Sequence, residues 1–185
     1  MSGDCQNCNR RTRSAHSGFT LTELLIVIAI IGILAAIAIP AMLRARRTGN
    51  EASAIGSLRA LNSAESSYAA VAGKGGFAAL LATLATPCPA GNAAFISPDL
   101  SIDPAVKSGY TITIGPSATS SPGPLDCNSV ATITAYYTTA VPVSAGMSGL
   151  RAFASSGGGA IFFDPAGVAP TEAQMAPGGG GTTIQ

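Results

Sequence analysis

The sequence lacks tryptophan, has a single histidine and carries charge on only 10% of its 185 residues. His16 stands near the N-terminus, so no later segment supplies the imidazole that many acid–base and zinc sites use. Neither Gly157–Gly159 nor Gly178–Gly181 precedes the Lys-Ser/Thr pair of a phosphate-binding loop. The net charge of +1 does not indicate the strongly basic surface that is typical of nucleic-acid-binding proteins. These absences predict a protein that is not an enzyme, holds no cofactor and binds no nucleic acid.

The acidic residues show no catalytic pattern either. Asp99 and Asp103, or Asp126 and Asp164, would form a pair of carboxylates only if the fold brought them together. Most carboxylates in proteins are exposed to water. We therefore expect these four residues to be solvated loop acids.

The longest apolar run lies from Leu24 to Ile39 and contains sixteen residues without a charge. Counted from Phe19 it has 21 residues, which as a helix are ~32 Å long and match the ~30 Å hydrocarbon core of a bilayer. Residues 19–40 are therefore predicted to form a hydrophobic transmembrane helix. Glu23 is the one acid in this helix, and an intramembrane carboxylate is a functional residue by default.

The segment before the apolar run indicates how the run is processed. Residues 1–18 are polar, contain three arginines and have no apolar core of their own, whereas an ordinary secretory signal is cut after its apolar core. The plausible cut here is the bond between Gly18 and Phe19, ahead of the run. Cleavage there removes a basic leader peptide and creates a new ammonium on Phe19, four residues from Glu23.

With this arrangement the chain resembles the precursors of type IV pilins and of type II secretion pseudopilins, over roughly residues 10–62. The resemblance rests on Gly18, Phe19, Thr20, Leu21, Glu23, Leu24, Leu25, Ile26, Val27 and Pro40. It implies cleavage after Gly18 by a membrane prepilin peptidase, which also methylates the new amine of Phe19. It further implies polymerisation with other pilin subunits by an inner-membrane assembly platform.

The orientation of the apolar helix is not determined by charge, because three arginines lie on each side of the apolar run. The resemblance places the leader in the cytoplasm of a bacterium and the rest of the chain beyond the inner membrane. The implied location is the inner membrane for the single-pass precursor and an extracellular filament for the assembled protein.

The four cysteines form two pairs. Cys5 and Cys8 lie in the leader, where a zinc site would need two more ligands and only His16 is at hand, so we expect an inert pair that is lost on cleavage. Cys88 and Cys127 lie in the part that the resemblance places in an oxidising compartment, which favours a disulfide. Two unrelated buried thiols are the alternative. A disulfide would close a loop of about 40 residues and stabilise the fold by ~4 kcal/mol.

The apolar helix is expected to have a weak point. Gly32 and Pro40 both lower helix propensity, and Pro40 lacks a backbone donor, so a helix that crosses them should bend or lose a hydrogen bond. In filaments of the pilins that the chain resembles, this segment can unwind when subunits leave the membrane. We mark both residues as the expected helix break.

After Pro40 the chain becomes amphipathic, and apolar residues recur at three- and four-residue spacing. The apolar positions are Ala54, Ile55, Leu58, Leu61, Tyr68 and Val71, and the charged residues at other positions are Arg46, Arg47, Glu51, Arg59 and Glu65. The pattern predicts one helix from Phe19 to Val71, with residues 41–72 as its amphipathic half. Glycines at positions 73, 75 and 76 end it.

Residues 73–176 are predicted to form a β-rich globular head, and residues 177–185 a disordered tail. A short helix is expected over Phe77–Ala85, and strands over Tyr110–Ile114, Val130–Val141, Leu150–Ala154 and Ala160–Phe163. The short connections favour an antiparallel meander whose apolar face covers the amphipathic helix. The predicted fold class is α+β, a long N-terminal helix packed on a small antiparallel sheet, which the resemblance identifies with the αβ-roll of pilins.

The predicted function is that of a structural subunit of a type IV pilus. If many copies pack their N-terminal helices side by side, Glu23 enters an apolar bundle and needs a cation, which the methylated amine of a neighbouring Phe19 would supply. Two alternatives stand beside it: the major pseudopilin of a type II secretion system, and a monomeric receptor or adhesin anchored by an uncleaved helix. Resembling major pseudopilins bind calcium near the C-terminus, where this chain has only Asp164 and Glu172, so no metal is expected.

Overall fold

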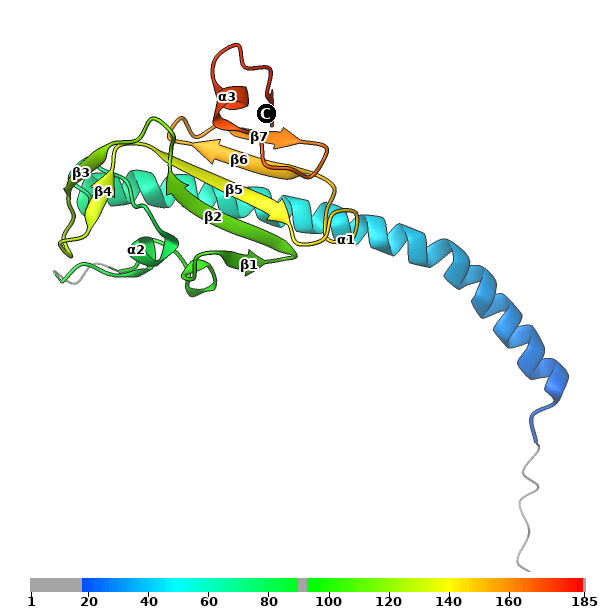
Figure 1. The fold of residues 1–185 in the computed structure, drawn as a ribbon. Coiled ribbons are helices and arrows are strands. Elements are labelled where there is room, and N and C mark those ends of the chain that lie inside the picture. The colour runs from blue at the N-terminus through cyan, green and yellow to red at the C-terminus, as the bar shows by residue number, and fades with distance from the viewer. Residues whose placement is uncertain (1–17, 90–92, 185) are drawn as a thin grey trace, which may run out of the picture. The chain divides into compact units, whose positions relative to one another are not determined.

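The computed structural model describes residues 18–89 and 93–184, and the chain forms two compact units that divide at Pro40 (Figure 1). The predicted leader peptide, with Cys5, Cys8 and His16, lies outside the described residues except for Gly18. The first unit contributes the N-terminal part of helix α1, and the second contributes the rest of α1 together with all the strands.

Helix α1 runs from Leu21 to Val71, so it starts two residues later than predicted and ends where predicted. The helix includes both Gly32 and Pro40, so neither residue ends it. A proline removes one donor from the helical ladder, and the apolar residues on either side of Pro40 continue the helix. Unwinding of this segment during assembly stays a prediction.

The second unit contains an antiparallel sheet that lies along the C-terminal half of α1 (Figure 1), which confirms the predicted α+β arrangement. Six strands pair in the order β1-β2-β5-β6-β7-β8, and β3 and β4 form a separate pair. The strands are β1 Ala105–Lys107, β2 Tyr110–Pro116, β3 Pro122–Leu125, β4 Ala131–Ile133, β5 Tyr136–Pro142, β6 Ala152–Ser156, β7 Ile161–Asp164 and β8 Thr182–Thr183; the short helices are α2 Leu81–Ala85, the 3₁₀ helix η1 Pro98–Leu100 and α3 Glu172–Met175.

The strand predicted over Val130–Val141 is two strands, and they belong to different sheets. The backbone leaves the β4 ladder at Thr134, whose N–H donates to the Ser121 carbonyl at 3.0 Å. Between β4 and β5, the Ala135 carbonyl accepts the N–H of Ser117 at 3.1 Å. The hairpin β3–β4 therefore interrupts the predicted meander. Strand β3 was not predicted because its sequence, Pro-Gly-Pro-Leu, is unfavourable for a strand interior.

The predicted disorder of residues 177–185 is wrong for the described part of this segment. Thr182 and Thr183 form β8 and pair with β7, and the N–H of Ile184 donates to the Ile161 carbonyl at 2.9 Å. Gly178 and Gly180 adopt positive φ values of 82° and 76°, which glycine allows without strain, so the chain turns back onto the sheet.

The core forms where the amphipathic half of α1 meets the sheet. Leu58 and Leu61 are fully buried there, together with Tyr110 of β2 and Phe153 of β6. Val71 departs from the prediction, because its side chain is 62% exposed at the last position of α1. The next residue, Ala72, is buried in its place.

The structure joins Cys88 and Cys127 in a disulfide whose Cα atoms are 5.6 Å apart. Cys88 follows α2, and Cys127 lies in the turn between β3 and β4. The bond therefore ties the β3–β4 hairpin to the segment after α2, two parts of the chain separated by 39 positions.

Replacing both cysteines by serine should lower the free energy of unfolding by ~4 kcal/mol, because the unfolded chain gains the freedom of a loop of about 40 residues. Urea unfolding of the full chain in detergent, followed by tyrosine fluorescence, measures the change. A reducing agent should destabilise the unsubstituted protein similarly and leave the double variant unchanged. Equal stability of the two proteins under oxidising conditions would contradict the prediction.

Candidate functional site

The N-terminal end of α1 is capped by reciprocal hydrogen bonds between Thr20 and Glu23. The backbone N–H and the hydroxyl of Thr20 donate to Oε2 of Glu23 at 2.9 and 2.7 Å, and the N–H of Glu23 donates to Oγ1 of Thr20 at 3.2 Å. This is a capping box, which satisfies backbone donors that the first helical turn leaves free. Glu23 therefore has a local structural role as well as its predicted role in assembly. The Thr-x-x-Glu spacing at positions 20–23 was the sequence signal for it.

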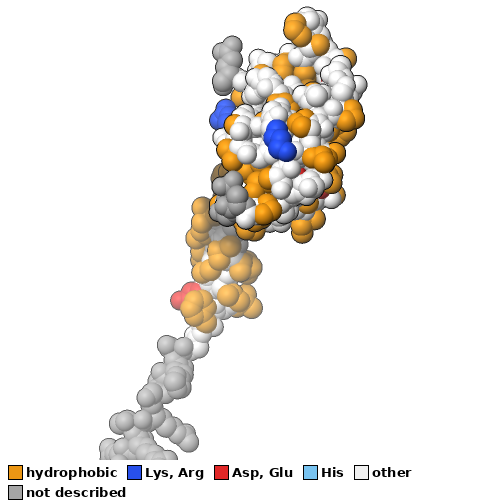
Figure 2. Space-filling model, turned by 90° about the vertical axis from the view of Figure 1, so that its left-hand side faces the viewer, with side chains coloured by type: hydrophobic (Ala, Val, Ile, Leu, Met, Phe, Trp, Pro, Cys, Tyr) orange, Lys and Arg blue, Asp and Glu red, His pale blue; other side chains and the backbone are white. Residues whose placement is uncertain are grey.

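The side chains around this cap are exposed. Phe19 and Leu21 are 75% and 76% exposed, and the apolar residues of the run from Leu24 to Ile39 are mostly exposed as well. Figure 2 shows hydrophobic side chains over the visible face of this part of the chain. Within the described residues, α1 is the one helix whose length and composition suit a membrane span. Such a surface needs a covering of lipid or of other apolar helices.

The predicted cleavage residues lie immediately before the helix. Gly18 and Phe19 have no regular secondary structure and are exposed. A Cβ atom built on Gly18 meets no atom within 4 Å, so local packing does not require glycine at this position.

Further along α1, the structure buries two acids that were assigned to the polar face. Glu51 is 7% exposed and Glu65 is fully buried. Both lie at the spacing of the core residues Ala54, Leu58 and Leu61, three or four positions from an apolar neighbour. Their spacing along the helix therefore indicated burial, whereas the charge of the two side chains indicated exposure.

Glu51 joins α1 to the chain before β6. Its carboxylate accepts the N–H of Leu150 at 2.9 Å and lies 2.7 Å from the guanidinium of Arg151. Burial raises the pKa of Glu51, but the hydrogen bonds from Leu150 and Arg151 outweigh burial and keep this pKa below its ordinary value. Glu51 is therefore an ionised anchor between helix and sheet.

Glu65 has fewer partners. One carboxylate oxygen accepts the N–H of Ala78 at 2.9 Å, and the other is buried without a hydrogen-bond partner among the described residues. Burial raises the pKa of Glu65 to about 8, against the smaller lowering effect of the Ala78 N–H. The side chain is therefore mostly protonated at neutral pH.

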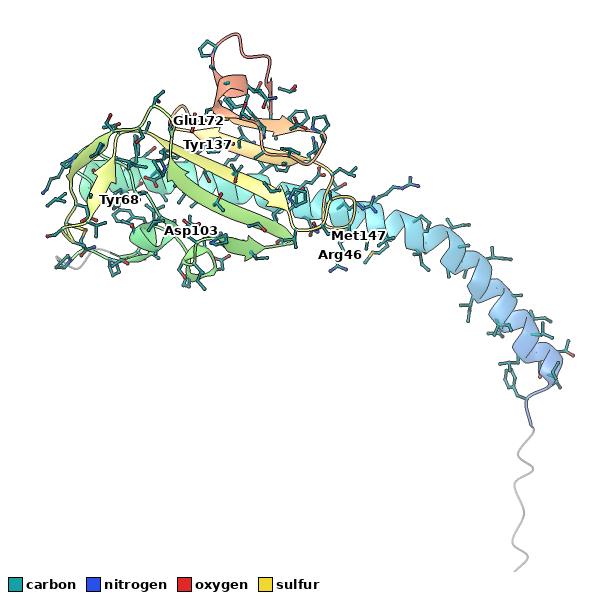
Figure 3. All side chains as sticks on the ribbon, in the orientation of Figure 1. Arg46, Tyr68, Asp103, Tyr137, Met147 and Glu172 are labelled. Atoms are coloured by element: carbon teal, nitrogen blue, oxygen red, sulfur yellow. A yellow bond between two sulfur atoms is a disulfide. The ribbon has the colours of Figure 1, made fainter. Side chains whose placement is uncertain are left out.

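A third buried acid corrects another prediction. Asp126, expected to be a solvated loop acid, is 4% exposed and accepts the hydroxyl of Tyr68 at 2.8 Å. Its other oxygen accepts the N–H groups of Asn128 and Val130. Tyr68 lies at the β3–β4 end of the sheet (Figure 3), so this hydrogen bond ties α1 to the hairpin that carries Cys127.

The other three acids named from the sequence have separate partners. Asp99 lies 2.6 Å from the ammonium of Lys107. Asp103 accepts a hydrogen bond from the N–H of Leu81 at 3.4 Å, and Asp164 accepts one from the N–H of Ala166. In the described part of the chain, no three histidine, cysteine, aspartate or glutamate side chains are grouped closely enough to hold a metal ion. The buried acids of the described head are therefore Glu51, Glu65 and Asp126.

Comparison with known proteins identifies the N-terminal segment. A family model described as a prokaryotic N-terminal methylation motif matches residues 13–39. This range contains the bond between Gly18 and Phe19, the capping pair of Thr20 and Glu23, and the exposed apolar helix. No curated protein and no solved structure matches the chain.

The buried Glu65 should make the stability of the protein depend on pH. Its pKa is about 8 in the folded chain against 4.5 as the ordinary value. Between these values the folded state binds more protons than the unfolded state, so the stabilisation is complete below pH 4.5 and is lost as the pH rises toward 8. The free energy of unfolding should fall by up to ~1.4 kcal/mol per pH unit in this window.

Urea unfolding of the full chain at intervals between pH 5 and about 8.5 measures the slope. The variant Glu65→Gln keeps the shape of the side chain but does not titrate, so its stability should vary less over the window. The neighbouring phenols of Tyr68 and Tyr136 have raised pKa values and stay protonated throughout. A slope that is the same in the variant would show that Glu65 is not its source.

Proposed function

We propose that this chain, which carries the prokaryotic N-terminal methylation motif, is the precursor of a structural subunit of a type IV pilus. The observation that carries the proposal is the apolar part of helix α1 within the motif, whose side chains are exposed and whose first turn contains a single acid, Glu23. The motif supports the broader class of type IV pilin and pseudopilin precursors. Within that class we infer a pilus subunit.

The first step of the proposed pathway is processing at the membrane. A prepilin peptidase cuts between Gly18 and Phe19 and methylates the new amine of Phe19. The amine remains protonated at neutral pH, because an ordinary α-amine has a pKa of about 7.7–8.0 and methylation leaves a basic nitrogen. The apolar helix anchors the subunit in the inner membrane until it is used, and its exposed surface fits a lipid environment.

The second step is transfer from lipid to a filament, carried out by the inner-membrane assembly platform. Packing of the N-terminal helices covers the apolar side chains with those of other copies and leaves Glu23 away from water. A carboxylate in such surroundings needs a cation, and the amine of Phe19 from a neighbouring copy is the cation proposed. The pair sets the register between subunits more than it adds net stability.

The capping box refines this mechanism. Within one chain the carboxylate of Glu23 accepts both the N–H and the hydroxyl of Thr20 through the same oxygen, Oε2. No described residue donates a hydrogen bond to the other oxygen, Oε1, which we propose accepts a partner from outside the chain. One carboxylate is thus arranged to close its own helix and to accept a second chain.

Mass spectrometry of the mature protein is the first test of the proposal. The expected N-terminus is a methylated Phe19, and residues 1–18 should be absent. Retention of the first eighteen residues would contradict processing and would favour a monomeric receptor or adhesin. Electron microscopy of material sheared from the cell surface should show filaments of this subunit; processed protein that is never found outside the cell would favour a pseudopilin.

Substitutions at Glu23 and Thr20 separate the assembly role from the capping role. Glu23→Gln removes the charge but preserves a capping box, because glutamine also serves at this position. We expect normal membrane insertion and processing but a roughly tenfold or greater loss of filament, since the buried amine of the neighbour is left unpaired.

The matched control is Thr20→Ala, which removes the cap and keeps the charge. It should weaken the helix start by ~1 kcal/mol and retain most of the filament yield. Sheared filaments are quantified by immunoblot against total processed subunit. Normal filament yield in Glu23→Gln, with the methylated N-terminus in place, would overturn the proposed ion pair.

A further inference from the structure

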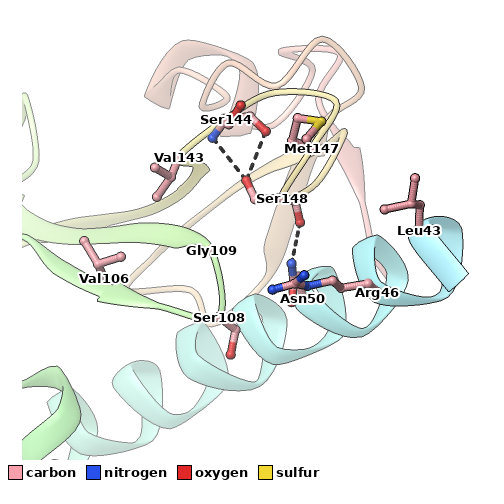
Figure 4. A pocket seen from close by; sticks show the side chains of 10 residues that line it. All are labelled: Leu43, Arg46, Asn50, Val106, Ser108, Gly109, Val143, Ser144, Met147 and Ser148. Carbon is pink, nitrogen blue, oxygen red and sulfur yellow. Dashed lines mark hydrogen bonds between the residues drawn. The ribbon is translucent and has the colours of Figure 1, made fainter.

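A groove of the described head lies beside the start of its helix and has a volume of about 470 Å³. Three segments line it: one face of α1, strand β1 with its turn to β2, and the loop after β5. Figure 4 shows Leu43 and Arg46 on the helix side and Val143 and Met147 on the loop side. Arg46 and Met147 also lie in the same region of the head in Figure 3.

The groove combines apolar walls with a single positive charge. The side chains of Val106, Val143 and Met147 are 66%, 59% and 69% exposed, which is unusual for apolar residues gathered in one place. Arg46 is the one charged residue among those that line the groove. The nearby acid Glu51 is buried and engaged with Arg151, so it does not neutralise this charge.

The loop side of the groove is held in place by hydrogen bonds. Asn50 of α1 donates through Nδ2 to the carbonyl of Ser148 at 2.8 Å. The hydroxyl of Ser148 donates to the carbonyl of Ser144 at 3.0 Å and accepts the N–H of the same residue at 3.1 Å (Figure 4). The loop side of the groove is therefore preformed by contacts within the chain.

The position of the groove along the chain limits what it can meet. Leu43 and Arg46 lie four and seven residues beyond Ile39, the last residue of the apolar run, which corresponds to ~6 and ~10 Å along a helix. The headgroup layer on each side of a bilayer is ~5–8 Å thick. While the apolar run spans the membrane, Leu43 is therefore held within the headgroup layer. Arg46 is held just beyond it, where its long side chain can reach back to the headgroups.

We infer that the groove binds an anionic phospholipid of the adjoining leaflet. Arg46 contacts the lipid phosphate, and Leu43, Val143 and Met147 contact the glycerol and the first acyl carbons. A phospholipid is favoured over a second copy of the chain because one molecule supplies both the anion and the apolar part, and the tether keeps it within reach. The inference rests on the proposed membrane location of the precursor.

The absence of tryptophan from the chain makes a direct test possible. The variant Met147→Trp places a single fluorophore in the groove, and the full processed chain is reconstituted into vesicles that contain brominated phospholipid, which quenches tryptophan on contact. The control Leu125→Trp places it on β3, at an apolar residue that is 54% exposed and does not line the groove. Quenching is compared for brominated anionic and brominated zwitterionic lipid.

We expect quenching at position 147 and little at position 125. Anionic lipid should be preferred over zwitterionic lipid by about fivefold, the factor that corresponds to one arginine at the membrane surface. The further substitution Arg46→Gln should abolish this preference, whereas Arg44→Gln, which removes the same charge from a residue outside the groove, should retain it.

Three results would overturn the inference: no quenching at position 147, a lipid preference that survives Arg46→Gln, or quenching that declines as the protein-to-lipid ratio rises, which would indicate a second copy in the groove. Flotation of the vesicles reports membrane anchoring separately. A chain that floats without quenching contradicts this site alone, whereas a chain that does not float contradicts the membrane location on which the proposed function also depends.

Discussion

An apolar helical surface has to be covered, and this constraint governs the N-terminal part of α1, up to Pro40. In the run from Leu24 to Ile39 the apolar side chains are exposed, and contact of apolar surface with water is unfavourable in free energy. A bilayer and a bundle of like helices both satisfy the constraint, and they do so with similar apolar contacts. Transfer from one to the other therefore involves little change in hydrophobic free energy. The difference between the two states falls on the few polar groups of the helix, above all on Glu23.

Helix α1 shows how strongly the surroundings decide what a carboxylate does. Glu23 is exposed and caps the first turn, Glu51 is buried but ionised beside Arg151, and Glu65 is buried with one hydrogen bond and a raised pKa. The three side chains are chemically identical. What separates them is the number of donors within reach and the access of water. The same helix thus provides a capping residue, an ionic anchor for the sheet and a titratable group in the core.

Much of the architecture could be predicted from the sequence, because apolar spacing determined it. The extent of α1, the antiparallel sheet on its amphipathic half and most strand positions follow from such patterns. The errors arose where contacts between distant segments outweigh local preference. Glu65 and Asp126 are buried by partners far away in sequence, at Ala78 and Tyr68, and the proline-rich β3 forms because β4 and the disulfide hold it. Glu23 at the start of α1 could be named as a candidate from the sequence because its context is local and its charge is isolated, and its role in assembly stays a proposal.

Strand β8 has a consequence for how copies of this protein can associate. It occupies the free side of β7, so the hydrogen-bonding groups on that side of the sheet are partly satisfied within the chain. At the opposite border the outermost strand, β1, has only three residues and ends in Lys107. Short or charged border strands resist pairing with another sheet. Growth by adding strand to strand at these two edges, the route that leads to amyloid-like aggregates, is therefore disfavoured.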